Sequence, residues 1–238
     1  MKTCRVGRIV GVRSVFAVAV WLLVAAVSSA HFVFIESAAE GDRLLVRSGF
    51  GELDGWDPDL VGRMSNSTFQ LRTTKGLKPL AMKVDDQEKE YRAAIEGEKP
   101  EAVLGVTDFG TIQFGTSPTS WLRYTAKHLV GDSKNWGEDK PTKDLRIELI
   151  AKLEGDKMKL RAIFLGKPLT GAKIKGATPS GNDFELLTDA KGQAELPVGE
   201  LGHYAMYVGT TTEKTGEING KEYDVLKDYT TLTFTIGK

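Results

Sequence analysis

Apolar and polar residues alternate along most of this chain with the period of a β-strand. In the segment 145–149, Leu145, Ile147 and Leu149 fall on one face and Arg146 and Glu148 on the other. This alternation is typical of an antiparallel sheet with one solvated side. Short segments rich in Val, Ile, Phe, Leu and Thr recur between Gly, Pro and Asp clusters. We expect strands at residues 31–36, 43–48, 68–73, 80–84, 91–95, 111–114, 145–151, 157–164, 172–177, 184–187, 193–196, 203–208 and 230–236.

Turn residues separate these segments. Asp189 to Gly192 suits a tight hairpin, because Asp bonds its own backbone and Gly tolerates positive φ. Gly166-Lys167-Pro168 predicts another turn, with Pro presetting φ. The segment 121–130 stays ambiguous between a helix and a strand. Trp121, Tyr124 and Leu129 would share a helix face, whereas Tyr124, Ala126, His128 and Val130 would share one side of a strand.

The polar, turn-rich stretch 131–143 has little to bury and marks a domain boundary. The lengths on either side suit one sandwich each, and the regular spacing of short strands favours sandwiches. We therefore predict an all-β protein of two antiparallel, Ig-like β-sandwich modules. The first would cover residues 31–135 and the second residues 144–238.

Residues 1–30 break the strand pattern and have the layout of a secretory signal peptide. Four basic residues precede or border an apolar run at 15–27, and Ser28-Ser29-Ala30 offers small residues for cleavage. The run is shorter than the ~20 residues of a spanning helix. We expect cleavage between Ala30 and His31 and a mature chain with no membrane span.

Charge and cysteine content narrow the compartment and the partners. Removing the leader takes four of the 32 basic residues and no acidic one, leaving 28 basic against 32 acidic. Such a balance gives no basic footprint for nucleic acid. Cys4 is the single cysteine and leaves with the leader, so the mature chain has no disulfide. Exported proteins without disulfides are ordinary in bacteria, which favours a periplasmic or secreted bacterial protein.

His31 is the strongest candidate for chemistry, since cleavage would make it the first residue. A terminal histidine offers a metal two donors, its free α-amine and its imidazole. His128 and His203 are the only other histidines and would complete a brace-like site. Nitrogen donors of this kind favour Cu(II) or Ni(II) in a tetragonal arrangement, with Zn(II) as an alternative. His128 and His203 have ordinary packing roles as alternatives, and chance alone would explain His31.

The stretch 49–58 is a second candidate surface. Aromatic residues on its glycine-rich backbone suit sugar or peptide binding, and an ordinary surface loop is the alternative. Glu36, Asp54 and Asp57 would add carboxylates to a metal site. Asp54, Asp57 and Asp59 would also suit Ca²⁺, although their spacing fits no established calcium loop.

Several motifs together resemble the NikM-like periplasmic family. A histidine followed by apolar residues comes directly after the leader, a Leu-x-Ile-Glu-Leu strand falls at 145–149, and a Thr-Asp-x-x-Gly turn falls at 188–192. The remaining motifs are Tyr124-Thr125-Ala126-Lys127, Gly166-Lys167-Pro168-Leu169-Thr170-Gly171-Ala172 and Gly202-His203-Tyr204. The C-terminal elements also resemble carboxypeptidase-regulatory-like and Cna-B-like sandwiches.

The resemblance implies a role in nickel or cobalt uptake, with a membrane uptake transporter as partner. From the residues we expect an exported protein that binds a nickel, cobalt or copper ion through His31. The alternative is a module without metal that binds glycans or proteins in adhesion or as an adaptor. No nucleophile elbow, His-Glu-x-x-His motif, P-loop or dinucleotide fingerprint occurs, so we expect no enzyme. A copper-dependent oxygenase is the remote enzymatic alternative.

Overall fold

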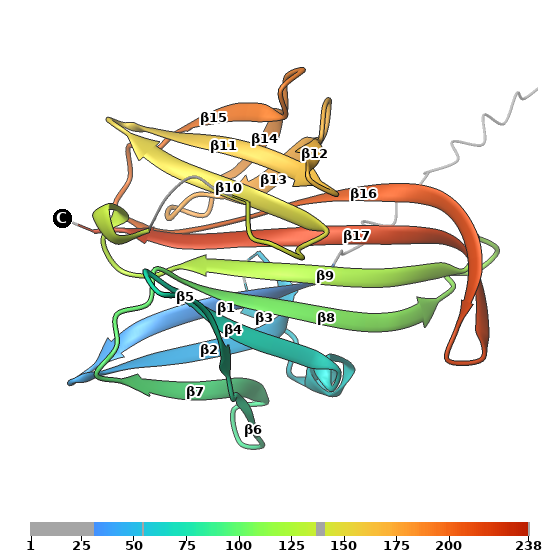
Figure 1. Cartoon of the computed structure of the whole chain (residues 1–238), viewed down its shortest axis with the longest axis horizontal. Helices are drawn as coiled ribbons and strands as arrows, with labels where there is room; N and C mark the ends of the chain where they lie inside the picture. Colours follow the sequence, from blue (N-terminus) through green and yellow to red (C-terminus); the bar gives the residue numbers. More distant parts are fainter. Residues whose placement is uncertain (1–30, 54, 137–140, 238) are drawn as a thin grey trace, which may run out of the picture.

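A long eight-stranded sheet runs through the middle of the molecule and contains strands from both halves of the chain (Figure 1). This computed structural model describes residues 31–53, 55–136 and 141–237. The sheet has the order β14-β13-β16-β17-β9-β8-β4-β5. Its strands are β4 (Ser67–Thr73), β5 (Gly76–Leu80), β8 (Ala102–Ile112), β9 (Ser120–Leu129), β13 (Lys173–Ala177), β14 (Asp183–Leu187), β16 (Gly202–Ile218) and β17 (Lys221–Ile236).

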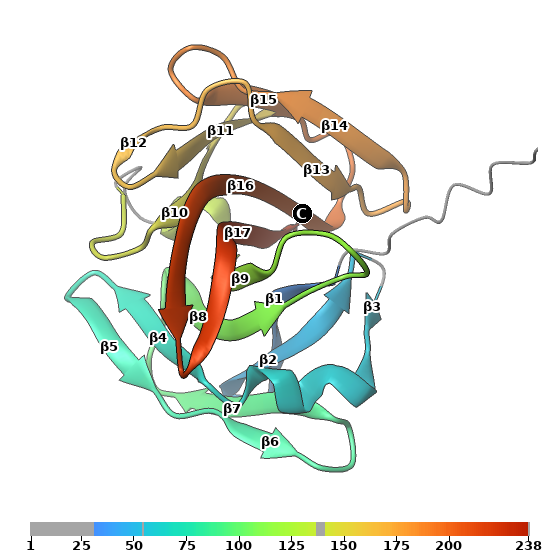
Figure 2. The same ribbon diagram turned by 90° about the vertical axis from the view of Figure 1, so that its right-hand side faces the viewer.

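Each half of the chain adds a smaller sheet of its own, one on either side of the central strands (Figure 2). The N-terminal sheet contains β1 (Phe32–Glu40), β2 (Arg43–Glu52), β3 (Gly55–Trp56), β6 (Lys83–Asp85) and β7 (Glu90–Glu96). The C-terminal sheet contains β10 (Ile147–Glu154), β11 (Lys157–Phe164), β12 (Lys167–Pro168) and β15 (Gln193–Pro197).

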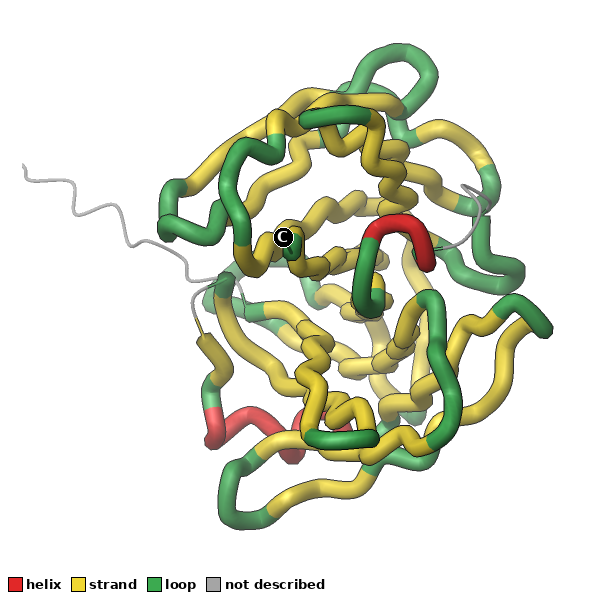
Figure 3. The backbone as a smooth tube through the Cα atoms, turned by 90° about the vertical axis from the view of Figure 1, so that its left-hand side faces the viewer, coloured by secondary structure: helices red, strands yellow, loops and turns green. Residues whose placement is uncertain are grey.

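The predicted all-β sandwich fold is confirmed. In the described part of the chain the helices are two short 3₁₀ turns, Pro58–Met64 and Ser133–Asn135 (Figure 3). No helix there is long and apolar enough to cross a membrane. The predicted leader and its cleavage site at Ala30 lie outside the described residues.

The two halves are joined through β9 and β17, which pair in parallel. Val225–Thr233 of β17 lies in register with Ser120–His128 of β9, whereas the other strand pairs are antiparallel. The two expected modules therefore share one continuous sheet. Each half still has its own hydrophobic core.

β9 and β17 are covered on both faces, which explains their mixed composition. Tyr124 and Ala126 of β9 belong to the N-terminal core, and Leu129 belongs to the C-terminal core. On β17, Leu232 and Phe234 are fully buried in the C-terminal core. A strand buried on both sides loses the simple alternation of one apolar and one solvated face.

Strand β1 docks on the central sheet through side-chain hydrogen bonds. β1 pairs with β2 along one edge only. Along its other edge, Thr231 Oγ1 donates to the Val33 carbonyl at 2.6 Å, and Thr233 Oγ1 donates to the Ile35 carbonyl at 2.5 Å. These buried hydroxyls satisfy carbonyls that a partner strand would otherwise satisfy.

Several expected elements differ from the structure in extent. Nearly all of the ambiguous segment 121–130 belongs to strand β9, and its pattern is ambiguous because side chains on both faces of the strand are buried. β8 begins well before the predicted 111–114, and β16 and β17 form a hairpin much longer than expected. The Asp189 turn is confirmed, since its carboxylate accepts from the backbone of Lys191 and Gln193.

The predicted Gly166-Lys167-Pro168 turn is displaced by one or two residues. Phe164 pairs with Lys167, so Leu165 and Gly166 make the turn, both with positive φ. Lys167-Pro168 instead forms the short strand β12.

Candidate functional site

His31 immediately precedes β1 and is half-buried against an aromatic wall. Its ring stacks on Phe50 with a centroid distance of 5.9 Å and an interplanar angle of 17°. Phe50 in turn stacks on Phe109, which anchors this wall in the N-terminal core. The stacking fixes the plane of the imidazole, so one ring edge is presented in a defined direction.

Asp57 faces the His31 imidazole. Its Oδ2 atom lies 3.6 Å from His31 Nε2. Its Oδ1 atom accepts a hydrogen bond from the backbone of Asp59 and caps the 3₁₀ turn that follows. The cap holds the carboxylate in place, leaving one oxygen for the histidine.

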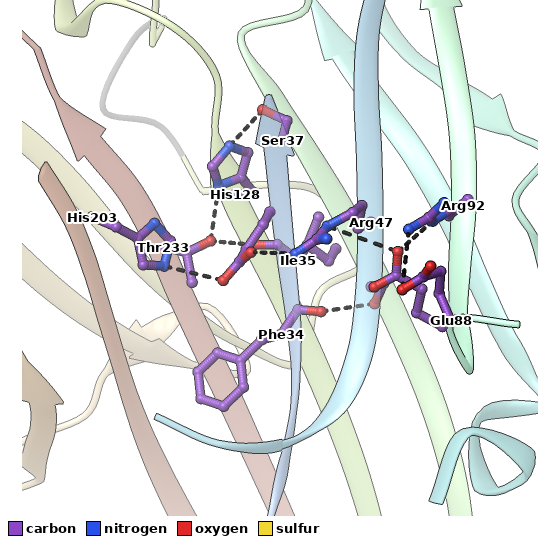
Figure 4. Close-up of polar contacts among 12 residues, drawn as sticks. Phe34, Ile35, Ser37, Arg47, Glu88, Arg92, His128, His203 and Thr233 are labelled. Carbon is purple, nitrogen blue, oxygen red and sulfur yellow. Dashed lines mark hydrogen bonds and ion pairs between the residues drawn. The ribbon is translucent and has the colours of Figure 1, made fainter. Parts of the chain in front are cut away.

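His128 lies deep between β1 and β17 (Figure 4). Its Nε2 atom is 2.8 Å from Ser37 Oγ, and its Nδ1 atom is 2.9 Å from Thr233 Oγ1. Burial, with a further contribution from nearby His203, lowers the pKa of His128 to about 3. His128 is therefore neutral at physiological pH.

The hydrogen-bond chain assigns the tautomer of His128. Thr233 donates its proton to the Ile35 carbonyl, so its oxygen accepts from Nδ1–H of His128. The unprotonated Nε2 then accepts from the Ser37 hydroxyl. Both ring nitrogens are thus engaged by hydroxyl groups, and neither is directed toward a metal.

His203 lies on β16 and belongs to a chain of charged groups that crosses β1 (Figure 4). Its Nε2 atom is 3.5 Å from Glu36 Oε1, and Arg47 approaches the other oxygen of Glu36 at 3.3 Å. Arg47 continues the chain to Glu90, 3.8 Å away. Burial lowers the pKa of His203, although the Glu36 carboxylate raises it in opposition.

The structure does not bring the three predicted ligands together. His128 contacts Ser37, which comes six residues after His31 along the extended strand β1. At ~3.3 Å per residue, His31 and Ser37 are about 20 Å apart. Glu36, which meets His203, is nearly as far along. Within residues 31–53, 55–136 and 141–237, no three His, Cys, Asp or Glu side chains are grouped to hold a metal. The expected site of His31, His128 and His203 is therefore not formed as predicted: His31 meets Asp57 at the far end of β1, whereas His128 and His203 are neighbours that contact different partners.

The stretch 49–58 is largely strand rather than loop. Gly51 pairs with Trp56 in a turn-back of β2 onto β3. A Cβ atom on Gly49 would overlap the Trp56 ring, so glycine is required for this close approach. Asp54, one of the predicted carboxylates, lies outside the described residues. Glu36 and Asp57 approach different histidines, His203 and His31 respectively.

Sequence reasoning missed Ser37 and Thr233 as the hydroxyl partners of His128, and Thr231 as the donor to the Val33 carbonyl. Thr231 and Thr233 alternate with Leu232 and Phe234 on a strand otherwise rich in apolar residues. Polar residues at every second position of a buried strand signal side-chain hydrogen bonds, because unpaired buried hydroxyls are costly. The alternating threonines can be seen in the sequence, but the groups to which they bond lie far away in the chain and cannot be identified from it.

Comparison with protein-family models gives no match for this chain, and no curated protein matches it. One similar solved structure comes from work on host cell surface retention of a 1.5-MDa bacterial ice-binding adhesin. It has 10% sequence identity and a TM-score of 0.24. The match covers 88% of this chain but only 65% of that one. A likeness at this TM-score carries no argument about function.

Proposed function

We propose that this is an exported, non-enzymatic protein that binds a nickel, cobalt or copper ion through His31 as the first residue of the mature chain. The α-amine and Nδ1 of a terminal histidine form a chelate within one residue. The observation that carries the proposal is the His31–Asp57 contact of 3.6 Å. A carboxylate beside Nε2 favours the tautomer that carries its proton there, which leaves Nδ1 for the ion.

The surroundings of His31 support this arrangement. Phe50 fixes the ring plane, and the capping bond from Asp59 fixes Asp57. The His31 side chain keeps 28% of its surface exposed, so water or a carrier has access to the ion. The proposal does not use His128, whose two nitrogens are occupied, or His203, which pairs with Glu36.

The protein would deliver its ion to, or receive it from, a membrane uptake transporter. This part of the proposal rests on the NikM-like motifs. A free α-amine has a pKa of about 7.7–8.0, and metal binding requires its deprotonated form. Binding is therefore expected to weaken as the pH falls below neutrality.

The test is a titration of the processed protein with Cu(II) and with Ni(II), in which calorimetry measures the affinity. Intact mass must first establish that the chain begins at His31. Adding one glycine before His31 moves the amine away but keeps the imidazole, and we expect at least tenfold weaker binding, about 1.4 kcal/mol. Asp57→Asn is expected to weaken binding about 10-fold or more. Asp59→Asn is the matched control and should leave affinity unchanged.

Three outcomes overturn the proposal. Unchanged affinity in the extended protein excludes the amine as a ligand. Unchanged affinity in His31→Ala places any metal elsewhere on the protein. A mature chain that begins at another residue also removes the argument.

A further inference from the structure

A groove of about 1150 Å³ lies where the N-terminal sheet meets the open face of β13, β14 and β16. Glu52 and Leu53, at the end of β2, line one side. Asp183 and Glu185 of β14 line the other, and Tyr207 of β16 contributes to the floor. The groove is separate from the His31–Asp57 pair, neither of which lines it.

A smaller pocket of about 200 Å³ adjoins this groove. The two cavities share Glu52, Leu53, His203 and Ala205 in their lining, so they form one continuous recess. Phe34 and Trp56 give the pocket apolar walls, and Glu36 and Glu52 give it two carboxylates. This combination suits a side chain that has an apolar stem and a cationic head.

The charge of the recess is negative. Among the described residues, Glu52 and Asp183 form no ion pair or side-chain hydrogen bond, although both line the groove. Lys175 is the one lysine or arginine in the lining of either cavity. It shares Glu185, at 3.6 Å, with Lys173, which lies 2.9 Å from the same carboxylate, so the negative charge of the recess comes from Glu52 and Asp183. His203 faces Glu36 from β16, and burial lowers its pKa, which disfavours the charged form of its imidazole.

Arg47 lies beside the pocket and belongs in this balance. It is shared between Glu36 and Glu90, at 3.3 and 3.8 Å. Only one Glu36 oxygen faces Arg47, since the other faces His203. Arg47 is thus paired with Glu36 and Glu90, and among the described residues it forms no ion pair with Glu52.

The aromatic residues do not provide open stacking platforms for a sugar. Arg47 lies over the Trp56 ring at 5.1 Å, and Gly49 lies directly against that ring. Tyr207 stacks on Phe32 with a centroid distance of 4.0 Å. Because other groups already lie against the faces of these rings, a sugar ring has no free face on which to stack. The recess is therefore better suited to an aliphatic or cationic side chain.

We propose that the groove binds an extended basic segment of a partner protein, with one lysine or arginine side chain inserted between Glu36 and Glu52. The aliphatic stem of that side chain packs along Phe34 and Trp56, and its charged head is bound by the two carboxylates. Charge-assisted hydrogen bonds of this kind are stronger than neutral ones. This inference is independent of metal binding at His31.

The test uses fluorescently labelled six-residue peptides that are identical except at one central position. That position is lysine, arginine, norleucine or glutamate, and binding to the full mature chain is followed by fluorescence anisotropy. We expect the lysine or arginine peptide to bind at least tenfold more tightly than the norleucine peptide. High salt should reduce this preference, because part of the groove is exposed.

Two matched variants locate the site. Glu52→Gln keeps the shape of the side chain and should reduce the preference for the basic peptide to less than threefold. Glu213→Gln makes the same change of charge on the exposed β16 arm, away from the groove, and should leave the preference intact. Because Glu52 is exposed, neither variant should impair folding, which circular dichroism would verify.

Equal binding of the lysine, arginine and norleucine peptides, or no binding of any of them, overturns the proposal. A preference for basic peptides that survives Glu52→Gln also overturns it, because the pocket would then not be the anchor. Binding of neutral oligosaccharides that is lost in Glu52→Gln, without binding of basic peptides, would assign the groove to glycans instead.

Discussion

Ser37 and His128 are separated by 91 positions in the chain, yet Ser37 Oγ lies 2.8 Å from His128 Nε2. This contact ties the outer edge of β1 to β9 in the central sheet. Together with the hydrogen bonds from Thr231 and Thr233, it determines where β1 lies. β1 also continues from His31 and carries Glu36, so both candidate sites depend on this docking.

Acid should destabilise the protein through His128. The folded pKa is about 3, whereas an unfolded histidine titrates near 6.5. The contribution of neutral His128 to stability is complete above pH 6.5 and is lost as the pH falls toward 3, because the unfolded chain then binds the extra proton. The loss approaches about 1.4 kcal/mol per pH unit in this window. Urea unfolding at a series of pH values measures it.

Two variants separate titration of His128 from its hydrogen bonding. His128→Gln removes the titrating group and should flatten the pH dependence between 6.5 and 3. Ser37→Ala removes one hydrogen bond but keeps the buried imidazole, so it should lower stability while preserving the slope. Equal slopes for the parent and His128→Gln would contradict the assignment.

The docking of β1 should weaken in Thr231→Val. The substitution keeps the shape of the side chain but leaves the buried Val33 carbonyl without its donor, which costs about 1–3 kcal/mol. Amide exchange should rise in β1 more than elsewhere. Thr235→Val is the control on the same strand, because Thr235 is exposed, and it should change neither measurement.

Glu148→Ala should be severely destabilising. Glu148 and Lys127 form an ion pair between β10 and β9, with only 4% and 3% of their side chains exposed. Removing the carboxylate breaks this buried ion pair and also removes the acceptor of two hydrogen bonds from Thr142, so we expect a loss of about 3–5 kcal/mol. Thermal or urea unfolding measures the loss.

An exposed ion pair serves as the comparison for Glu148. Glu154→Ala removes a surface partner of Lys152 and should change stability little. The double variant Lys127→Met/Glu148→Leu should recover much of the stability that Glu148→Ala loses. A double variant as unstable as the single one would show that the pair contributes more than compensation of charge.

Gly49→Ala should displace Trp56. The added Cβ atom would overlap the indole ring, and relieving the overlap should cost about 1–3 kcal/mol. Tryptophan fluorescence should change as well, because the displaced indole ring of Trp56 moves relative to the small pocket that it lines. Gly62→Ala is the control, since nothing lies within 4 Å of the position its Cβ would occupy. Unchanged stability and fluorescence in Gly49→Ala would exclude this close approach.

Local chemistry was sufficient to predict the all-β class and the Asp189 turn. Strand alternation and Asx-turn geometry both depend on residues close in sequence. The same local reading left β9 undecided between helix and strand, and it made the strands of the long β16–β17 hairpin too short. β9 is buried on both faces, and the hairpin arm is polar, so neither shows the expected alternation.

The sequence by itself determined the class of fold, the candidate histidines and the prediction of a histidine at a mature N-terminus. Only the tertiary structure decided which residues meet. It placed His31 with Asp57, His128 with Ser37 and Thr233, and His203 with Glu36. Each of these contacts except His31–Asp57 joins residues more than 90 positions apart. Long-range pairing of this kind depends on how whole sheets pack, and no local pattern of residues encodes it.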